Sequence, residues 1–356
     1  MANKWLKQLR SYEDTVDYEY DSYAKENVIT TPSPYFNWIF ANKSHGCPKN
    51  ASILLFSEPK AGKSLAIYSI VLQIQREDKD LPEDKKRICI IFNTEMRGAL
   101  QSNVFPEINK DLMIIYDTNN PVEIFDRVEK EIKPLTQDGM PLGLIAIDSL
   151  TNIMGVKRGD TDSVADHLVG DHALTVSIGL QKLIPFCKQN KIPLIATSQM
   201  RGNVDAVNKY APKEKMAESW AAKHGFEFYI SFKKAGAAED KQDIEGKSFT
   251  EDDQKDARGQ ELVTGHKIYV KMEASSIGQP GRAGVFFLDY KKGITNTHEE
   301  LFFLGYNTGV IKREGTKTYT FGEHKFNGKK ECALALRDDK TLYEEVLAAV
   351  IAKDAQ

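Results

Sequence analysis

The sequence predicts an α/β fold with a mostly parallel sheet. In the middle of the chain, apolar runs of strand length alternate with segments of helical periodicity. Continuous apolar strands separated by helices are typical of a parallel sheet that is covered on both faces. Beyond residue 225, apolar runs follow one another without helices between them, which predicts antiparallel strands that extend the same sheet. The 356 residues are enough for one large core and smaller flanking parts.

The expected elements come in a regular order. Five strands of the parallel part are expected at 51–56, 87–93, 111–117, 142–148 and 192–198. Helices at 63–76, 121–132 and 172–190 connect them, and Pro185 is expected to interrupt the last of these. The antiparallel extension is expected at 226–232, 267–273 and 283–289. Residues 235–261 are polar and charged, which predicts an exposed insertion or a mobile loop.

Composition and charge exclude several classes of protein. No run approaches the roughly 20 apolar residues that a membrane-spanning helix needs. The N-terminus lacks the apolar core of a signal peptide, which predicts a cytoplasmic protein. The net charge of -3 excludes a globally basic nucleic-acid binder, so any such contact must come from local loops or from a surface that assembly creates. The scattered cysteines are expected to be reduced packing residues: Cys47, Cys89, Cys187 and Cys332.

The segment SEPKAGKS at residues 57–64 predicts a phosphate-binding loop. It follows an expected strand and opens an expected helix, as a P-loop does. Lys63 would reach the β- and γ-phosphates of ATP, and Ser64 would ligate Mg²⁺. Ser57 stands where the usual motif has its first glycine, and the alternative is a strand-to-helix turn that happens to contain GKS. The residues expected to bind the nucleotide are Ser57, Glu58, Pro59, Lys60, Ala61, Gly62, Lys63, Ser64 and Leu65.

Three polar residues follow the expected strands. Asp148 ends the apolar run LIAID and suits a role in holding Mg²⁺ beside the P-loop. Glu95 follows the strand expected at 87–93 and could activate the attacking water. Gln199 ends a later strand and could sense the γ-phosphate, since contacts to this group drive switches in other proteins. The alternatives are a loop-capping Asp, a solvent-facing Glu and a polar residue at a strand end.

The order of these four elements resembles the recombinases of the RecA/UvsX family, the UvsX type being encoded by phages. FNTE, IAIDSL and SQMR are similar to family segments that carry the catalytic Glu, the metal-binding Asp and the switch Gln. The segment ELFFLGYNTGVIKREGTKTYTFGEHKFNGKKECALALRDD resembles the small C-terminal domain of RecA. The resemblance implies a RecA-like P-loop core with a mostly parallel sheet, an antiparallel extension and a small α+β C-terminal domain.

The resemblance also implies a division of the chain and a set of partners. Residues 1–35 would form a polymerisation arm, 36–298 the ATPase core with its DNA-binding loops, and 299–356 the C-terminal domain. ATP and Mg²⁺ would be the cofactors. Single-stranded and double-stranded DNA, other copies of the chain in a helical filament, and single-strand-binding and mediator proteins would be the partners. A phage-encoded chain of this kind would work in the host cytoplasm.

Two DNA-binding loops follow from the same resemblance, at about 154–170 and 201–224. Arg201 is the strongest single candidate, because it directly follows the switch Gln in SQMR. An aromatic side chain in the second loop could stack on bases. For each cation the alternative is a solvated surface charge. The expected DNA-binding residues are Lys157, Arg158, Arg201, Lys209, Tyr210, Lys213 and Lys215.

The sequence departs from the family at the neighbouring-subunit contact. RecA presents two lysines from one strand to the nucleotide of the next subunit, and KIYVKME matches the first as Lys271 but has Glu273 at the second. Lys271 is therefore expected to act on a neighbour's ATP, with an ordinary strand lysine as the alternative. The aromatic residue that stacks on adenine has no clear match, and Phe105 is a candidate only.

The leading hypothesis is a DNA-dependent ATPase whose filament pairs homologous strands. A hexameric replicative helicase with the same ATPase core is the second reading, and the short segment of about 50 residues before the P-loop strand disfavours it. A filament or scaffold protein that binds ATP without hydrolysing it is the third. The presence of Lys63, Ser64, Glu95 and Asp148 disfavours that reading.

Overall fold

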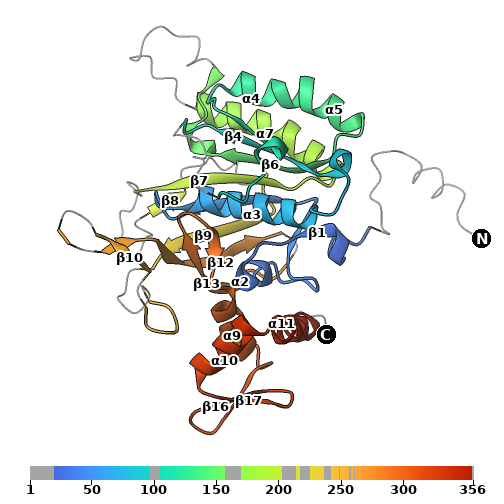
Figure 1. The fold of residues 1–356 in the computed structure, drawn as a ribbon. Coiled ribbons are helices and arrows are strands. Elements are labelled where there is room, and N and C mark those ends of the chain that lie inside the picture. Colours follow the sequence, from blue (N-terminus) through green and yellow to red (C-terminus); the bar gives the residue numbers. More distant parts are fainter. Residues whose placement is uncertain are drawn as a thin grey trace, which may run out of the picture.

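The computed structural model describes residues 20–96, 105–156, 170–202, 214–216, 225–235, 242–247, 249–255, 258–259, 261–276 and 278–354. These residues form a mixed α/β core around a ten-stranded sheet, as the sequence predicts. The strands lie in the order β14-β13-β12-β9-β3-β7-β6-β4-β5, and β8 pairs with β7 outside this path. Figure 1 shows α4, α5 and α7 at one end of the molecule and α9, α10 and α11 at the other.

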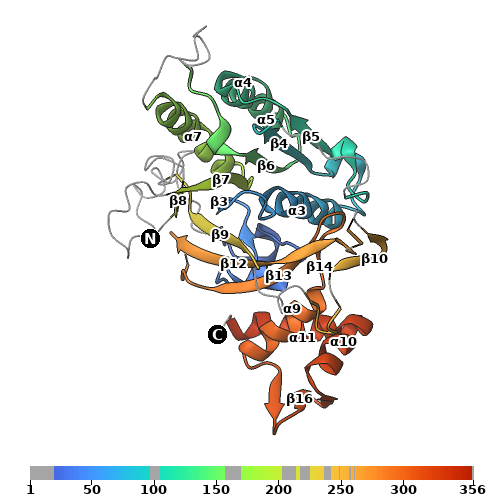
Figure 2. The same ribbon diagram turned by 90° about the vertical axis from the view of Figure 1, so that its left-hand side faces the viewer.

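Most strands of the large sheet are parallel. The parallel strands are β3 (Ser52–Ser57), β4 (Ile88–Asn93), β5 (Met113–Tyr116), β6 (Leu142–Asp148), β7 (Leu194–Gly202) and β9 (Phe228–Lys234). The antiparallel strands are β8 (Glu214–Met216), β12 (Gly265–Ser275), β13 (Ala283–Asp289) and β14 (Gly293–Thr295). Figure 2 shows β9, β12 and β13 side by side beyond β3.

Helices cover both faces of the parallel part. The helices are α3 (Lys63–Glu77), α4 (Pro121–Arg127), α5 (Lys133–Gln137) and α7 (Asp171–Gln189), and a π-helical segment, Val128–Ile132, joins α4 to α5. Successive residues of a strand point to opposite faces. Accordingly Ile53 and Leu55 of β3 belong to the apolar cluster that includes α3, whereas Leu54 belongs to the cluster that includes α4 and α7.

Two expectations about individual elements are wrong. Pro185 does not interrupt its helix, because α7 runs unbroken from Asp171 to Gln189. Pro185 lies on the exposed side of α7, while Leu183 and Phe186 on either side of it are buried in the core. Packing of the apolar face therefore outweighs the lost backbone hydrogen bond and the ring clash.

The first strand expected to be antiparallel to the core is in fact parallel to it. β9 pairs with β3 in parallel register, from Ile53 opposite Phe228 to Phe56 opposite Ser231, and only its other neighbour, β12, is antiparallel. A parallel pair requires a crossover of a dozen or more residues. The connection between β7 and β9 is long enough for such a crossover, although its sequence does not show the periodicity of a helix.

Smaller elements precede or link the core strands. They are a 3-10 turn at Lys25–Asn27, β1 (Val28–Ile29), α2 (Pro34–Trp38), β2 (Cys47–Pro48), and further 3-10 turns at Glu83–Lys85, Lys110–Leu112 and Leu150–Asn152. β1 and β2 form an antiparallel pair. The described part of the insertion at 235–261 contributes β10 (Thr250–Lys255), which pairs with β11 (Glu261–Val263), and its Phe249 stacks on Phe287 of β13 with ring centroids 3.7 Å apart.

The C-terminal part has an apolar cluster of its own. Its elements are α9 (Thr297–Asn307), β15 (Lys312–Glu314), β16 (Thr318–Phe321), β17 (His324–Asn327), α10 (Lys329–Asp338) and α11 (Lys340–Asp354). Leu301, Phe302 and Leu304 of α9 pack with residues of α10 and α11. The sheet of β15, β16 and β17 is antiparallel, which agrees with the expected α+β character.

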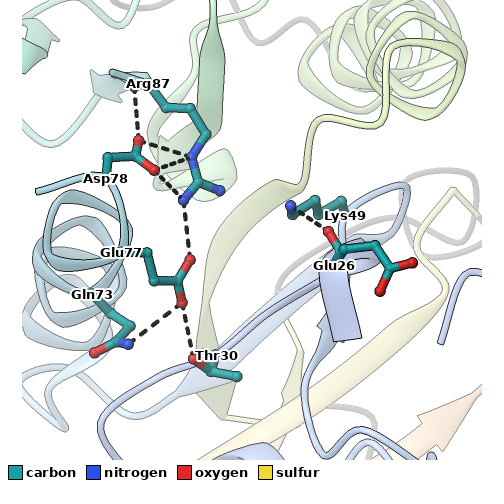
Figure 3. Close-up of polar contacts among 7 residues, drawn as sticks. All are labelled: Glu26, Thr30, Lys49, Gln73, Glu77, Asp78 and Arg87. Atoms are coloured by element: carbon teal, nitrogen blue, oxygen red, sulfur yellow. Dashed lines mark hydrogen bonds and ion pairs between the residues drawn. The ribbon is translucent and has the colours of Figure 1, made fainter. Parts of the chain in front are cut away.

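A polar cluster ties α3 to the end of the sheet where β4 begins (Figure 3). The carboxylate of Asp78, which follows α3, accepts hydrogen bonds from the backbone N–H of Arg87 at 2.8 Å and from its guanidinium at 2.7–3.0 Å. Glu77 accepts further bonds from Arg87, Thr30 and Gln73. Because Asp78 is buried, this fork of charge-assisted bonds compensates for its lost hydration.

In the part of the chain that the structure describes, no helix combines the length and the apolar character needed to cross a bilayer. The four cysteines are all buried and none forms a disulfide. Burial raises the pKa of Cys89 to about 12, which keeps its thiol protonated at neutral pH.

Candidate nucleotide site

Parallel strands bring the predicted residues to one edge of the sheet. The P-loop follows β3, Glu95 follows β4, Asp148 ends β6 and Gln199 lies in β7. The pairing register places Ser57 opposite Gln199 and Asn93 opposite Asp148. Since the carboxyl ends of parallel strands meet at the same edge, side chains that are far apart in the sequence converge here.

The P-loop depends on a glycine where the chain approaches the sheet extension. Gly62 has φ +93°, and a Cβ atom there would lie 2.3 Å from the side chain of Leu288 in β13. Lys63 is buried, and its Nζ donates to the hydroxyl of Ser57 at 2.7 Å. Ser57 in turn donates to the carbonyl of Glu58 at 2.6 Å. The serine that replaces the usual first glycine thus helps to position the lysine.

Asp148 and Ser64 form a pair of oxygen donors. The hydroxyl of Ser64 donates to Asp148 Oδ2, and Thr197 of β7 donates to Asp148 Oδ1 at 2.5 Å. Carboxylate and hydroxyl oxygens are ligands that suit Mg²⁺, which commonly keeps several waters and takes few protein ligands. The donor set therefore fits the magnesium ion that the sequence predicts.

Glu95 and Gln199 contact each other directly. The amide Nε2 of Gln199 donates to Glu95 Oε1 at 2.6 Å, and the backbone N–H of Gln199 donates to Thr151 at 3.1 Å. The loop before Glu95 is fixed by Thr94, whose backbone N–H donates to the carbonyl of Asp148 at 2.8 Å. Sequence spacing alone predicts that both residues reach this edge, and the structure adds that they are hydrogen-bonded partners.

One cavity of about 390 Å³ brings together Lys63, Ser64, Glu95, Asp148 and Gln199. Ser57 and Glu58, which were also expected to bind the nucleotide, are not among its lining residues. The cavity is lined by Pro59, Lys60, Ala61, Gly62, Lys63, Ser64, Leu65, Glu95, Asp148, Gln199, Lys234, His266 and Tyr290. The last three residues were missed by sequence reasoning. They come from β9, from β12 and from the turn after β13, so only the sheet topology could have placed them beside the P-loop.

Distant relatives of the chain are known proteins with the name RecA. The RecA of Mesomycoplasma hyopneumoniae strain 7448 is 21% identical over 308 residues, which are 86% of this chain and 81% of the relative. The RecA of Chlorobium limicola is 23% identical over 314 residues, 87% of this chain and 79% of the relative. That of Oleidesulfovibrio alaskensis is 20% identical over 328 residues, 91% and 82%. No family model matches the chain. The relatives support its membership of the RecA superfamily.

The three lining residues that sequence reasoning missed form what we call the second wall of this cavity: Lys234, His266 and Tyr290. Nδ1 of His266 lies 3.0 Å from the hydroxyl of Tyr290. Burial, and then the charge of Lys234, lower the pKa of His266 to about 4. His266 is therefore a neutral imidazole at physiological pH.

Two residues that the RecA resemblance singled out lie outside this cavity. Lys271 is half-exposed on β12, where its Nζ pairs with Glu273 at 2.6 Å. His266 and Lys271 are five positions apart on the same strand, which corresponds to roughly 17 Å. A contact of Lys271 with another subunit's nucleotide stays a prediction. Phe105 is buried against Tyr68 in the core, so it does not line the cavity as an adenine-stacking residue would.

The expected DNA-binding residues are only partly within the described chain. Arg201 lies in β7, two residues after Gln199, and it pairs in register with Lys215 of β8. Both strands overlap the expected second DNA loop at 201–224, and the segment between them is part of it. The remaining candidates lie outside the described residues: Lys157, Arg158, Lys209, Tyr210 and Lys213.

Proposed function

We propose that this protein is an ATP-dependent DNA recombinase of the phage UvsX type. It forms a filament on single-stranded DNA and promotes homologous pairing and strand exchange in recombination, repair and replication. Its enzymatic activity is DNA-dependent hydrolysis of ATP with Mg²⁺. The similarity to RecA proteins over most of the chain supports this proposal.

The observation that carries the proposal is the position of Gln199. It touches Glu95 in the nucleotide cavity, and its own strand continues into Arg201 and the β7–β8 pair. Loss of the γ-phosphate would therefore change the contacts of Gln199 and the position of the strand that leads to the second DNA loop. Such a link is what an ATP-controlled DNA-binding filament requires.

In this mechanism the chain's own groups divide the work. Lys63 and the P-loop N–H groups hold the phosphates, and Ser64 and Asp148 would hold Mg²⁺, which neutralises charge that develops on the phosphate oxygens. Glu95 accepts a proton from the attacking water, and Gln199 orients the Glu95 carboxylate. Binding of DNA then depends on the cations of the loops, which contact the phosphate backbone rather than the bases.

Electron microscopy of negatively stained samples tests the proposal. With an ATP analogue and single-stranded DNA, the wild-type chain is expected to form helical filaments, whereas the Lys63→Ala variant is expected to form none. Closed rings would instead favour the replicative helicase. Filaments without any DNA-stimulated ATP hydrolysis would favour the non-catalytic scaffold.

A further inference from the structure

The nucleotide cavity holds a cation that the sequence patterns do not reveal. Lys234 is the last residue of β9, and it lines the same cavity as the P-loop. We propose that Lys234 is a second phosphate-directed cation, supplied in cis by the chain that also supplies the P-loop. This inference rests on the proposed function, because it assigns a further residue to that same nucleotide site.

The sheet topology explains why Lys234 reaches the phosphates. β9 and β3 are parallel neighbours, and Phe56 at the end of β3 pairs with Ser231 of β9. The three residues after Ser231 therefore run beside the turn that begins at Ser57. The parallel direction of β9 is essential here, since an antiparallel strand in this position would carry residue 234 to the opposite edge of the sheet.

Alternation along β9 separates Lys234 from its neighbour. Adjacent residues of a strand point to opposite faces, and Lys233 is not among the residues that line the cavity. Both lysines are exposed. Lys233 is therefore a matched control of the same residue type, on the same strand and one position away.

The charge of Lys234 acts within the cavity. Besides Lys60 and Lys63 of the P-loop itself, it is the lysine or arginine that lines this cavity in the described part of the chain. Within that same part, no carboxylate forms an ion pair with it. The pKa of the adjacent His266 is lowered by burial and by the charge of Lys234, so the second wall carries a single positive charge.

The cavity also needs this charge. A bound triphosphate, together with the carboxylates of Glu95 and Asp148, brings more negative charge than Lys60, Lys63 and one Mg²⁺ neutralise. A cation on a long flexible side chain can approach phosphate oxygens without holding a fixed geometry. Lys234 meets this description, whereas neutral His266 does not.

Equilibrium binding to free protomers, without DNA, tests the proposal. The ligands are Mg²⁺-ATP and Mg²⁺-tripolyphosphate, which has the phosphates but no nucleoside. Lys234→Ala is expected to raise Kd for both ligands about 10-fold, as for the loss of one charge-assisted contact. Lys234→Arg should restore most of the affinity, and Lys233→Ala should match the wild type. The loss should shrink as salt increases.

Two results would overturn the assignment of Lys234. One is a Kd of Lys234→Ala within about twofold of the wild type for both ligands. The other is a loss of ATP affinity with unchanged tripolyphosphate affinity, which would place Lys234 against the nucleoside instead. If the wild-type chain bound neither ligand, the proposed function would fail before Lys234 came into question.

Discussion

At the scale of single residues, the candidate site depends on side chains that hold one another. Ser57 positions Lys63, Thr197 positions Asp148, and Gln199 positions Glu95, each through a hydrogen bond of 2.5–2.7 Å. Preorganised groups of this kind avoid reorganisation during the reaction, which is where electrostatic stabilisation is most effective. The chemistry is therefore assigned to pairs of residues and not to single positions.

Substitution of Glu95 separates binding of ATP from hydrolysis. In Glu95→Gln the side-chain carbonyl can still accept from Gln199, but the group no longer takes a proton. Turnover of ATP on single-stranded DNA is expected to fall by about 10²–10⁴-fold, as for the loss of a general base. Filaments should still form, and they should persist. Steady-state ATPase assays and microscopy check this, with Lys63→Ala as the variant that loses both properties. Wild-type turnover in Glu95→Gln would remove Glu95 from the mechanism.

The second wall predicts a pH dependence of stability. The pKa of His266 is about 4 in the folded chain, against an ordinary value of 6.5. Between these pH values His266 binds a proton in the unfolded chain but not in the folded chain. The free energy of unfolding therefore falls as pH falls from 6.5 towards 4. Above pH 6.5 His266 is mostly neutral in both states, so its titration no longer lowers the free energy of unfolding.

A variant isolates this effect from other titrating groups. His266→Phe keeps an aromatic ring but cannot take up the proton. As pH falls from 6.5 to 4.5, the free energy of unfolding should fall by about 1–2 kcal/mol more in the wild type than in the variant, after allowance for solvent screening. Denaturant titrations at several pH values measure it. A difference that is constant over this range would mean that the two states bind protons equally at His266.

At the scale of elements, β7 connects the nucleotide cavity to the expected DNA loop. Gln199→Ala is expected to bind ATP with near wild-type affinity but to lose most of the stimulation of ATPase by DNA. The reason is that β7 then loses its bond to Glu95, while Lys63 and Asp148 are unchanged. ATPase rates with and without single-stranded DNA measure the ratio. Met200→Leu, the next residue of β7, serves as the control. Full stimulation in Gln199→Ala would show that another element carries the coupling.

Individual strands differ in how well the sequence predicts them. The bounds of β6 and β13 agree with the expected ranges, because an uninterrupted apolar run or a regular alternation defines each of them. The direction of β9 was not predictable in this way, since it depends on where a long connection returns the chain. For the same reason Lys234 and His266 were missed: their place beside the P-loop follows from strand order and not from any local motif.

The continuity of α7 illustrates a second limit. Pro185 has a strong local preference against helix interiors, worth about 3 kcal/mol or more. Its exposed position lets the buried residues before and after it keep their contacts with the sheet. Tertiary packing decided the outcome, and that information is absent from a residue and its immediate neighbours.

At the scale of the whole molecule, polar contacts attach the C-terminal part to the rest of the chain, and two of them involve buried or half-buried carboxyl groups. The hydroxyl of Ser33 donates to the buried carboxyl group of Glu300 in α9. At the end of α11, Asp354 accepts from Arg282 at 2.6 Å and lies 2.8 Å from His45. The second contact lies beside the sheet extension, because Arg282 directly precedes β13.

Assembly of several copies is expected to complete the nucleotide site. Lys271 does not line the cavity of its own chain and lies roughly 17 Å along β12 from His266, which does. The RecA resemblance suggests that Lys271 reaches the ATP of a neighbour. Lys271→Ala should then bind nucleotide as a free protomer, in contrast to Lys234→Ala, but hydrolyse ATP poorly on DNA. A charge supplied in trans is worth about 10³–10⁵ in rate in other phosphoryl-transfer enzymes. The contact with Glu273 at 2.6 Å must open for this role, so Glu273→Ala should leave hydrolysis at or above the wild-type rate.

Mixed filaments test the shared site directly. A Lys63→Ala subunit has a defective P-loop but still carries Lys271, and a Lys271→Ala subunit has an intact P-loop. Where Lys271 of a Lys63→Ala subunit faces the nucleotide site of a Lys271→Ala neighbour, the two subunits together form one complete site. Mixing the two variants on single-stranded DNA should therefore give more ATPase activity than either variant alone, with a maximum at an intermediate ratio. Lys63→Ala mixed with a Lys63→Ala, Lys271→Ala double variant should give no gain, because neither has a working P-loop. If mixed filaments form but activity never exceeds that of the separate variants, Lys271 acts within its own subunit or not at all.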